Sequence, residues 1–439
     1  MSNIQKLPPT ILVIFGITGD LSRRYLLPAL AGICRNNQLG KDFIILGISR
    51  REVEPNDLFG ENEQNLSKYS QVLTMDLAKA QDYEKLSSKI DELSEVFEQR
   101  PQVIFYLSVP PTAVGPIVEH LGAAELNNQD HKLLLEKPFG FDLESAKDLV
   151  GHISNHFKEE QVYRIDHYLA KQMVQNITIY LSQNTWLKEL ANKNFVEKIE
   201  IDALETIGIE ERAVFYESTG ALRDFVQSHL LQLAALILME PCKDITDFEE
   251  LVPHRRAALE SIEPIGEEVC VKRALRAQYE GYGQEVGNPG TKVETFVSLP
   301  VYSRDPQWQG VPVILTTGKK LDQKLTEIRV HFKKDSSANA KMLRMQIQPQ
   351  QHIELEKWAD GAAGAEKIPQ DFKEHHASLP DAYQQVLADA MRSNHGLFAS
   401  SEEVLASWRV LQPLQDYWSM HDNLVVYKPG STVSQVLES

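Results

Sequence analysis

With 439 residues the chain is longer than one ordinary domain core, so two domains or three are expected. Hydrophobic residues make up 42% and aromatic residues 8%, which is typical of a folded soluble protein. The formal net charge of −17 argues against non-specific binding to nucleic acid or to an anionic membrane, because both need a basic surface. An anionic substrate would need a local cluster of basic side chains.

Short β-rich runs alternate with helical stretches over the N-terminal third. The expected strands cover residues 10–16, 43–49, 71–77, 103–109 and 132–138. Helices are expected at 22–36 and 78–98. This alternation predicts a parallel, doubly wound sheet, and hence a Rossmann-type dinucleotide-binding domain over residues 1–171.

The pattern changes from about residue 172, where strands begin to follow one another. The alternating runs cover residues 196–204, 292–302, 311–318, 326–333 and 341–349. Successive strands favour a mostly antiparallel sheet backed by helices, and so an α+β domain over 172–439. Residues 356–378, rich in Ala, Gly, Lys and Glu, are expected to form an exposed loop.

The cysteine spacing, the N-terminal residues and the length of the apolar runs bear on metal binding and on the cellular location of the protein. Cys34, Cys242 and Cys270 are far apart and form no CxxC pair, so we expect free thiols and no metal site. The first ten residues, MSNIQKLPPT, show no secretory signal. The longest apolar run, 230–239, is far below the roughly 20 residues needed to span a bilayer. These features predict a cytoplasmic protein.

A glycine turn joins the first strand to the first helix in ILVIFGITGDLSRR. Gly16 and Gly19 would let the backbone approach a phosphate at the helix N-terminus, where free N–H groups favour an anion. The spacing GxxGDL differs from the usual GxGxxG, and an ordinary strand-to-helix turn is the alternative. Its position at the start of a strand–helix–strand unit favours a dinucleotide site.

The second strand runs into GISRR, which bears on the choice of coenzyme. Arg50 and Arg51 stand where an enzyme that prefers NAD commonly has an acid. An arginine at this position suits the 2′-phosphate of NADP. Solvated surface arginines are the alternative interpretation. We therefore predict NADP as the coenzyme.

The stretch YRIDHYLAK, residues 163–171, gathers four side chains that can carry charge or move protons. If a helix begins near Asp166, then His167 and Lys171 lie four residues apart on one face. Two cationic groups at a helix start would form a phosphate site. A surface helix with incidental charges is the alternative.

A candidate base lies in GALRDFVQSHLLQLAALILM. His229 is at the head of a long apolar helix, and a histidine can remove a hydroxyl proton near neutral pH. A core histidine would fit the same position. Asp224, five residues earlier, would point elsewhere if both residues were helical, so we expect it to precede or cap the helix.

Taken together, these segments resemble the glucose-6-phosphate dehydrogenase family over most of the chain. The matching motifs, in family order, are GxxGDL at 16–21, FYLSVPP at 105–111, LEKPFG at 135–140, RIDHYLAK at 164–171, GALRDFVQSHLLQL at 220–233, GVPVILTTGKKL at 310–321 and LPDAYQQVLADAM at 379–391. The resemblance implies oxidation of D-glucose 6-phosphate at C1 to 6-phospho-D-glucono-1,5-lactone, with hydride transfer to NADP+. It also implies a homodimer or homotetramer, with dimerisation through the sheet of the second domain.

The resemblance implies a role for each matching residue. His229 would be the base, and Asp166 would be its orienting carboxylate. The sugar phosphate would contact Lys137, His167, Tyr168, Lys171, Glu205, Asp224, Lys319 and Lys324. The coenzyme would contact Gly16, Thr18, Gly19, Asp20, Leu21, Arg50, Pro110 and Lys137.

The chain departs from the family pattern at several positions that spare the proposed catalytic residues. Tyr25 replaces a lysine, LSQN at 181–184 replaces RFAN, and Thr316 replaces the arginine of RTGK.

One alternative function is a sugar or polyol dehydrogenase, which would not need the His167–Lys171 phosphate site. Another is a regulatory or assembly subunit of low activity.

Overall fold

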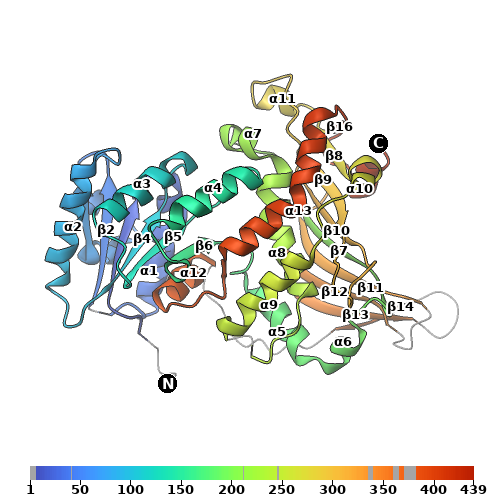
Figure 1. The fold of residues 1–439 in the computed structure, drawn as a ribbon, viewed down its shortest axis with the longest axis horizontal. Coiled ribbons are helices and arrows are strands. Elements are labelled where there is room, and N and C mark those ends of the chain that lie inside the picture. Colours follow the sequence, from blue (N-terminus) through green and yellow to red (C-terminus); the bar gives the residue numbers. More distant parts are fainter. Residues whose placement is uncertain are drawn as a thin grey trace. The chain divides into compact units, whose positions relative to one another are not determined.

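The computed structural model describes residues 6–40, 42–210, 212–244, 247–334, 340–358, 365–369 and 382–439. The chain divides into two compact units, whose elements are labelled in Figure 1. Unit 1 comprises Met1–Gly140, Glu144–Lys171 and Ser378–Ser401. Unit 2 comprises Phe141–Leu143, Gln172–Ala377 and Glu402–Ser439.

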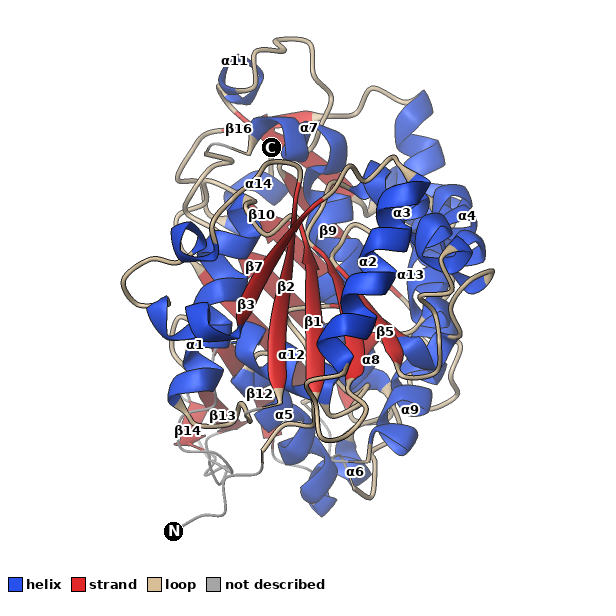
Figure 2. Cartoon of the chain, turned by 90° about the vertical axis from the view of Figure 1, so that its left-hand side faces the viewer, coloured by secondary structure: helices blue, strands red, loops and turns tan. Residues whose placement is uncertain are grey.

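Within the described residues, unit 1 is built on a seven-stranded sheet with the order β15-β6-β5-β4-β1-β2-β3. Its strands are β1 (Thr10–Phe15), β2 (Phe43–Ser49), β3 (Ser70–Thr74), β4 (Gln102–Leu107), β5 (His131–Leu135), β6 (Val162–Ile165) and β15 (Phe398–Ala399). Neighbouring strands are parallel, except that β15 is antiparallel to β6. Figure 2 shows β3, β2 and β1 side by side. The predicted doubly wound parallel sheet is confirmed.

Helices pack on both faces of this sheet because the side chains of each strand alternate. The helices are η1 (Ser22–Leu26), α1 (Leu27–Arg35), η2 (Pro55–Leu58), η3 (Gln64–Tyr69), α2 (Ala80–Ser94), α3 (Pro111–Ala123), α4 (Leu143–Ser154), η4 (Glu159–Gln161) and α12 (Ala382–Met391). Leu12 and Ile14 of β1 join the apolar core that includes α1 and α12. Phe15 instead stacks on Tyr83 of α2, with ring centroids 6.4 Å apart.

Residues 378–401 belong to unit 1, although the sequence placed them in the second domain. The reason is tertiary packing. Val386 and Leu387 of α12 share the apolar core with α1. Lys132 of β5 donates to the carbonyl of Ala390 at 2.7 Å, and β15 then pairs with β6. A late segment of the chain thus completes the first sheet.

Unit 2, where described, contains a nine-stranded sheet with the order β14-β13-β12-β11-β7-β10-β9-β8-β16. Its strands are β7 (Val196–Leu204), β8 (Leu275–Tyr279), β9 (Phe296–Val301), β10 (Val313–Gly318), β11 (Leu325–Phe332), β12 (Ala340–Gln348), β13 (His352–Trp358), β14 (Ala365–Pro369) and β16 (Val425–Tyr427). Only β7–β10 and β8–β16 are parallel among these neighbours, so the predicted mostly antiparallel sheet is confirmed. The prediction of a loop at 356–378 is wrong for the parts that belong to β13 and β14. The rest of the predicted loop lies outside the described residues.

The helices of unit 2 are α5 (Gln172–Gln183), α6 (Thr185–Leu190), α7 (Ala213–Ala221), η5 (Leu222–Leu230), α8 (Leu231–Leu238), α9 (Phe248–Ser261), α10 (Glu267–Lys272), α11 (Tyr282–Glu285), α13 (Ser401–Met420) and α14 (Val433–Leu437). The apolar α8 is buried along its whole length. A buried ion pair of 2.5 Å between Arg255 and Glu403 joins α9 to α13. In the part of the chain that the structure describes, no helix is long and apolar enough to cross a membrane.

Candidate active site

The glycine turn lies where the strand order of the unit 1 sheet reverses. β1 stands between β2 and β4, and a dinucleotide binds in such sheets beyond the carboxyl ends of the strands at this reversal. Gly16 has a φ of +78°, and a Cβ at this position would clash with the carbonyl oxygen of Ser108, which follows β4. The hydroxyl of Ser22 donates to the carbonyl of Gly16 at 3.0 Å. Only glycine fits this close turn.

The predicted coenzyme residues all come shortly after the ends of parallel strands. Gly16, Thr18, Gly19, Asp20 and Leu21 follow β1, Arg50 follows β2, Pro110 follows β4, and Lys137 follows β5. Because the carboxyl ends of parallel strands share one edge of a sheet, the fold gathers these residues at that edge. Arg50 is exposed at the end of β2, and Asp20 pairs with Arg24 at 2.7 Å.

His167 is anchored by a carboxylate that is only 12% exposed. Its Nε2 lies 3.2 Å from Oε2 of Glu136, whose Oε1 accepts the hydroxyl of Tyr106 at 2.5 Å. Burial favours a higher pKa for Glu136, but the contacts with His167 and Tyr106 outweigh burial and lower that pKa. The His167 ring lies 4.3 Å from that of Tyr383 in α12. Its Nδ1 is buried and has no hydrogen-bond partner among the described residues, so this nitrogen can meet a ligand.

Residues 167–170 form a turn, and α5 begins only at Gln172. The prediction that a helix begins near Asp166 is therefore wrong. The cause is local, because Oδ1 of Asp166 accepts the N–H of Tyr168 at 2.9 Å, and such a bond favours a turn over a helix. Lys171 nevertheless returns to this turn, with Nζ 3.5 Å from the centroid of the Tyr168 ring.

Glu205 and Lys319 form a close ion pair in unit 2. They follow β7 and β10, which run parallel and side by side, so the strand ends bring the two residues together. Nζ of Lys319 lies 2.5 Å from Oε2 of Glu205, and the lysine side chain is only 8% exposed. The same nitrogen lies 5.1 Å from the ring centroid of Tyr216 and 5.8 Å from that of Phe225. Two predicted sugar-binding residues thus adjoin the segment that carries Asp224.

Asp224 and His229 lie in the same helical segment, η5, which has π-helical hydrogen bonding. The expectation that Asp224 precedes or caps the helix is wrong, because Asp224 lies in the first turn of η5. The wider π-helical turn, with its i→i+5 hydrogen bonds, brings residues five apart closer to one face than an α-helix does. Both side chains are buried, and the ring of His229 meets Phe225 edge-on at 5.6 Å.

Glu294 closes the N-terminal end of η5. Its Oε1 accepts the N–H of Leu222 at 2.9 Å, and its backbone carbonyl accepts the N–H of Ala221 at 3.0 Å. Gly220, with a φ of +64°, separates η5 from α7. Burial raises the pKa of the Glu294 carboxyl.

Sequence reasoning missed both Glu136 and Glu294. Glu136 is part of the LEKPFG motif, and that motif was the signal that could have singled it out. Glu294 lies just before the buried run that leads into β9, and no local pattern marks it, because its partners Ala221 and Leu222 are more than 70 residues away in the chain.

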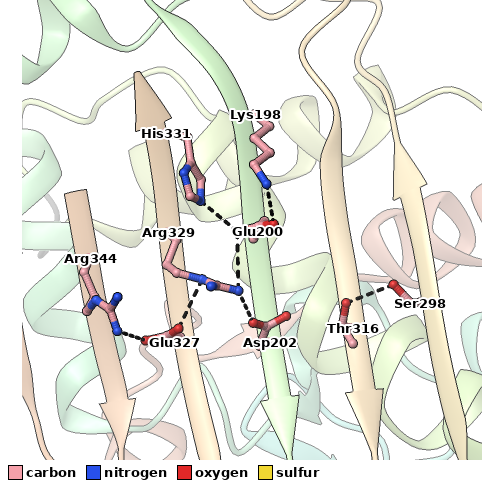
Figure 3. A network of polar contacts seen from close by, with 9 residues as sticks. All are labelled: Lys198, Glu200, Asp202, Ser298, Thr316, Glu327, Arg329, His331 and Arg344. Carbon is pink, nitrogen blue, oxygen red and sulfur yellow. Dashed lines mark hydrogen bonds and ion pairs between the residues drawn. The ribbon is translucent and has the colours of Figure 1, made fainter. Parts of the chain in front are cut away.

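Lys324 is the remaining predicted sugar-binding residue of unit 2. It is exposed just before β11 and lines a separate cavity of about 830 Å³ on the sheet. A network of charged side chains lies beside this cavity. Figure 3 shows that Arg329 lies between Asp202, Glu200 and Glu327 in this network. The sugar-binding role of Lys324 stays a prediction.

The fold and the candidate site define a class of protein. A Rossmann-type sheet with a glycine turn at its reversal point, followed by an α+β unit that holds a buried histidine, is the architecture of an oxidoreductase with a nicotinamide dinucleotide coenzyme. In the described ranges, no group of three or more His, Cys, Asp or Glu residues is arranged to hold a metal ion.

Comparisons with known proteins identify the family. The NAD-binding domain of glucose-6-phosphate dehydrogenase matches residues 13–176, and the C-terminal domain of the same family matches residues 179–438. The chain belongs to the glucose-6-phosphate dehydrogenase family. Membership confirms the predicted family, fold class and dehydrogenase activity.

Individual relatives match over almost their whole length. The glucose-6-phosphate 1-dehydrogenase of Aggregatibacter actinomycetemcomitans is 34% identical over 96% of this chain and 93% of its own. That of Bacillus subtilis strain 168 is 32% identical over 97% and 95%. A glucose-6-phosphate dehydrogenase solved in complex with glucose 6-phosphate superposes with a TM-score of 0.89 at 26% identity, covering 100% of this chain and 98% of that one.

Proposed function

We propose that the chain oxidises D-glucose 6-phosphate at C1 to 6-phospho-D-glucono-1,5-lactone, with NADP+ as the hydride acceptor. This reaction is the first step of the oxidative pentose phosphate pathway. The observation that carries the proposal is the buried Nδ1 of His167, which has no partner among the described residues although its ring is held by Glu136 and Tyr383. A buried polar atom without a partner costs free energy, and a ligand oxygen would remove that cost.

The 6-phosphate is proposed to bind His167, Tyr168 and Lys171. Nδ1 of His167 can donate to a phosphate oxygen when the ring is protonated, and the ammonium of Lys171 adds a second cation. The Tyr168 ring holds that ammonium at the turn. Short-range contacts of this kind are needed because the chain carries a net charge of −17.

His229 is proposed to accept the proton of the C1 hydroxyl, and Asp166 is proposed to orient its ring. Asp166 belongs to unit 1 and His229 to unit 2, so their pairing remains a prediction. The sugar hydroxyls would contact Glu205, Asp224 and Lys319, and Lys137 would lie between coenzyme and sugar.

NADP is the proposed coenzyme. The glycine turn at Gly16 leaves backbone free of a Cβ at the reversal point of the sheet, which fits a dinucleotide phosphate. Arg50, exposed at the end of the neighbouring strand β2, fits the 2′-phosphate. The other residues proposed to hold the coenzyme are Thr18, Gly19, Asp20, Leu21, Pro110 and Lys137.

One assay tests the activity. Reduction of NADP+ is followed with glucose 6-phosphate, with free glucose and without sugar. Rapid reduction with the phosphorylated sugar alone is expected. Equal rates with free glucose would indicate a sugar or polyol dehydrogenase, and no reduction with either sugar would indicate a subunit without catalytic activity.

A homodimer or homotetramer in the cytoplasm is also proposed, with subunits joined through the sheet of unit 2. The support is the charged network on that sheet, whose Arg329 and Glu200 side chains are 27% and 17% exposed in the single chain. Light scattering after size-exclusion chromatography measures the mass, and a monomeric mass would contradict this part of the proposal.

A further inference from the structure

A second cavity, of about 470 Å³, lies in unit 2, and neither Glu205 nor Lys319 is among its lining residues. It is lined by one end of α13 and the residues after it, by β8, by the segment before β9 and by the start of η5. We call it the α13 cavity, and its lining residues include Arg223, Arg276, Lys292, Glu294, Gln415, Trp418, His421 and Asp422. Its volume falls in the range of roughly 300–1,000 Å³ that is usual for small-molecule sites.

Two buried polar atoms of α13 that belong to lining residues have no hydrogen-bond partner among the described residues. They are the indole Nε1 of Trp418, a donor, and Oε1 of Gln415, an acceptor. Trp418 is only 6% exposed. Since buried polar groups nearly always find partners, a molecule that both accepts and donates hydrogen bonds is expected here.

The charges of the lining favour an anion. Arg223, Arg276 and Lys292 are basic, whereas Glu294 and Asp422 are the acidic residues of the lining. Arg276 donates from Nε to the side chain of Asn423 and from Nη2 to the carbonyls of Trp418 and His421. Its Nη1 takes part in none of these three hydrogen bonds. Three basic and two acidic side chains give the lining a small formal excess of positive charge in a chain of net charge −17, which favours an anion at short range.

We propose that the α13 cavity binds a small organic anion that also carries hydroxyl groups, such as a phosphorylated or carboxylated polyol. The anionic group meets the basic side chains, and the hydroxyl groups satisfy Gln415 and Trp418. None of the proposed catalytic or sugar-binding residues lines the cavity, although Leu222, Arg223 and Glu294 of the lining lie at the start of η5, which carries Asp224. The test needs no turnover, so failure of the proposed function leaves this proposal standing.

The test uses the indole N–H signals in a ¹⁵N-labelled sample of the full chain. The sequence contains five tryptophans, and the Trp418 signal is identified by its loss in Trp418→Phe. Titration with glycerol 3-phosphate or D-gluconate is expected to shift this signal saturably, whereas neutral glycerol leaves it in place. No shift with either anion, or an equal shift with glycerol, overturns the proposal.

Two substitutions with opposite expected effects locate the binding. Lys292→Gln should weaken the titrated affinity by roughly threefold to fivefold, a modest factor because this side chain is 60% exposed. Asp422→Asn should tighten binding by a similar factor, since Asp422 pairs with Lys292 at 2.6 Å and competes with the ligand for it. Lys428→Gln, exposed and outside the lining, is the control. If Lys292→Gln changes the affinity no more than Lys428→Gln does, the anion binds elsewhere and the proposal is wrong.

Discussion

His167 and Lys171 form the proposed phosphate site at the scale of single residues. Glu136 holds Nε2 of the His167 ring, and Tyr383 packs against the ring, so its orientation is set before a ligand arrives. The Tyr168 ring holds the ammonium of Lys171 in the same turn. Preorganised side chains of this kind lose little conformational freedom on binding.

Lys171→Thr should raise KM for glucose 6-phosphate by roughly 10- to 150-fold, because it removes one charge-assisted hydrogen bond. Free glucose has no phosphate, so its kcat/KM should barely change. Steady-state assays with both sugars give the ratio of the two specificity constants. An unchanged ratio would place the phosphate elsewhere.

His229→Asn should lower kcat by about 10²- to 10⁴-fold, because the hydroxyl proton loses its acceptor. Binding of sugar phosphate and coenzyme, measured by calorimetry, should change little. Asp166→Asn should also reduce kcat, since the imidazole loses its orienting partner. Near-normal turnover of the His229 variant would move the base to another residue.

Arg50→Asp should weaken NADP binding by roughly 10- to 150-fold and affect NAD much less, because only NADP carries the 2′-phosphate. Titrations of both coenzymes provide the comparison. A wild type that uses NAD better, or an equal loss for both coenzymes, would contradict the assignment of Arg50.

At the scale of elements, the start of η5 positions two proposed functional residues. Gly220 turns the chain with a φ of +64°, and Glu294 then caps the N–H groups of Ala221 and Leu222. Asp224 follows within the first turn. The position of Asp224 therefore depends on a glycine and on an acidic residue from a distant segment.

Gly220→Ala should lower the free energy of unfolding by about 1–3 kcal/mol, because alanine is strained at this positive φ. The new Cβ would also lie 2.5 Å from Oε1 of Glu294, so kcat should fall as the start of η5 shifts. Urea unfolding and steady-state kinetics measure the two effects. Gly290→Ala, with no atom near its Cβ, is the matched control and should stay within about 0.5 kcal/mol of wild type. Equal effects of the two substitutions would disprove this role of Gly220.

At the scale of the whole molecule, the unit 2 sheet carries buried charge. Burial raises the pKa of Asp202 to about 6, although Arg329 partly offsets the effect. The pKa of Glu200 is instead lowered to about 2, because contacts with His331, Lys198 and Arg329 outweigh burial. Beside them, the hydroxyl groups of Thr316 and Ser298 form a hydrogen bond of 3.1 Å (Figure 3).

Asp202→Asn should flatten the pH dependence of stability between pH 4 and 6. The folded-state pKa of about 6 exceeds the usual 3.8, so the folded chain binds this proton more tightly than the unfolded chain does. The Asp202 carboxyl makes its full contribution to the free energy of unfolding below pH 3.8. This contribution is lost as the pH rises to 6, at up to about 1.4 kcal/mol per pH unit. Urea unfolding from pH 4 to 7 measures the slope, with the exposed Asp322→Asn as control. An unchanged slope for Asp202→Asn would show that Asp202 does not titrate in this range.

The sequence by itself determined the features whose causes lie within a few residues. The β-branched run before Gly16 and the regular alternation of strands and helices sufficed for the Rossmann-type sheet, and the order of the motifs sufficed for the family. Local reasoning failed where a side chain competes with the helix, as Asp166 does by bonding the N–H of Tyr168. It failed again at Asp224, whose helical position depends on π-helical bonding.

Only the tertiary structure decided which side chains meet. Glu136 and His167 are 31 residues apart in the chain, Leu222 and Glu294 are 72 apart, and Glu205 and Lys319 are 114 apart. Helix α12 likewise joins the first sheet from near the end of the chain. Such contacts depend on the paths of whole strands and on the burial of apolar faces. The residues next to each partner in the sequence therefore do not indicate which distant residue it contacts.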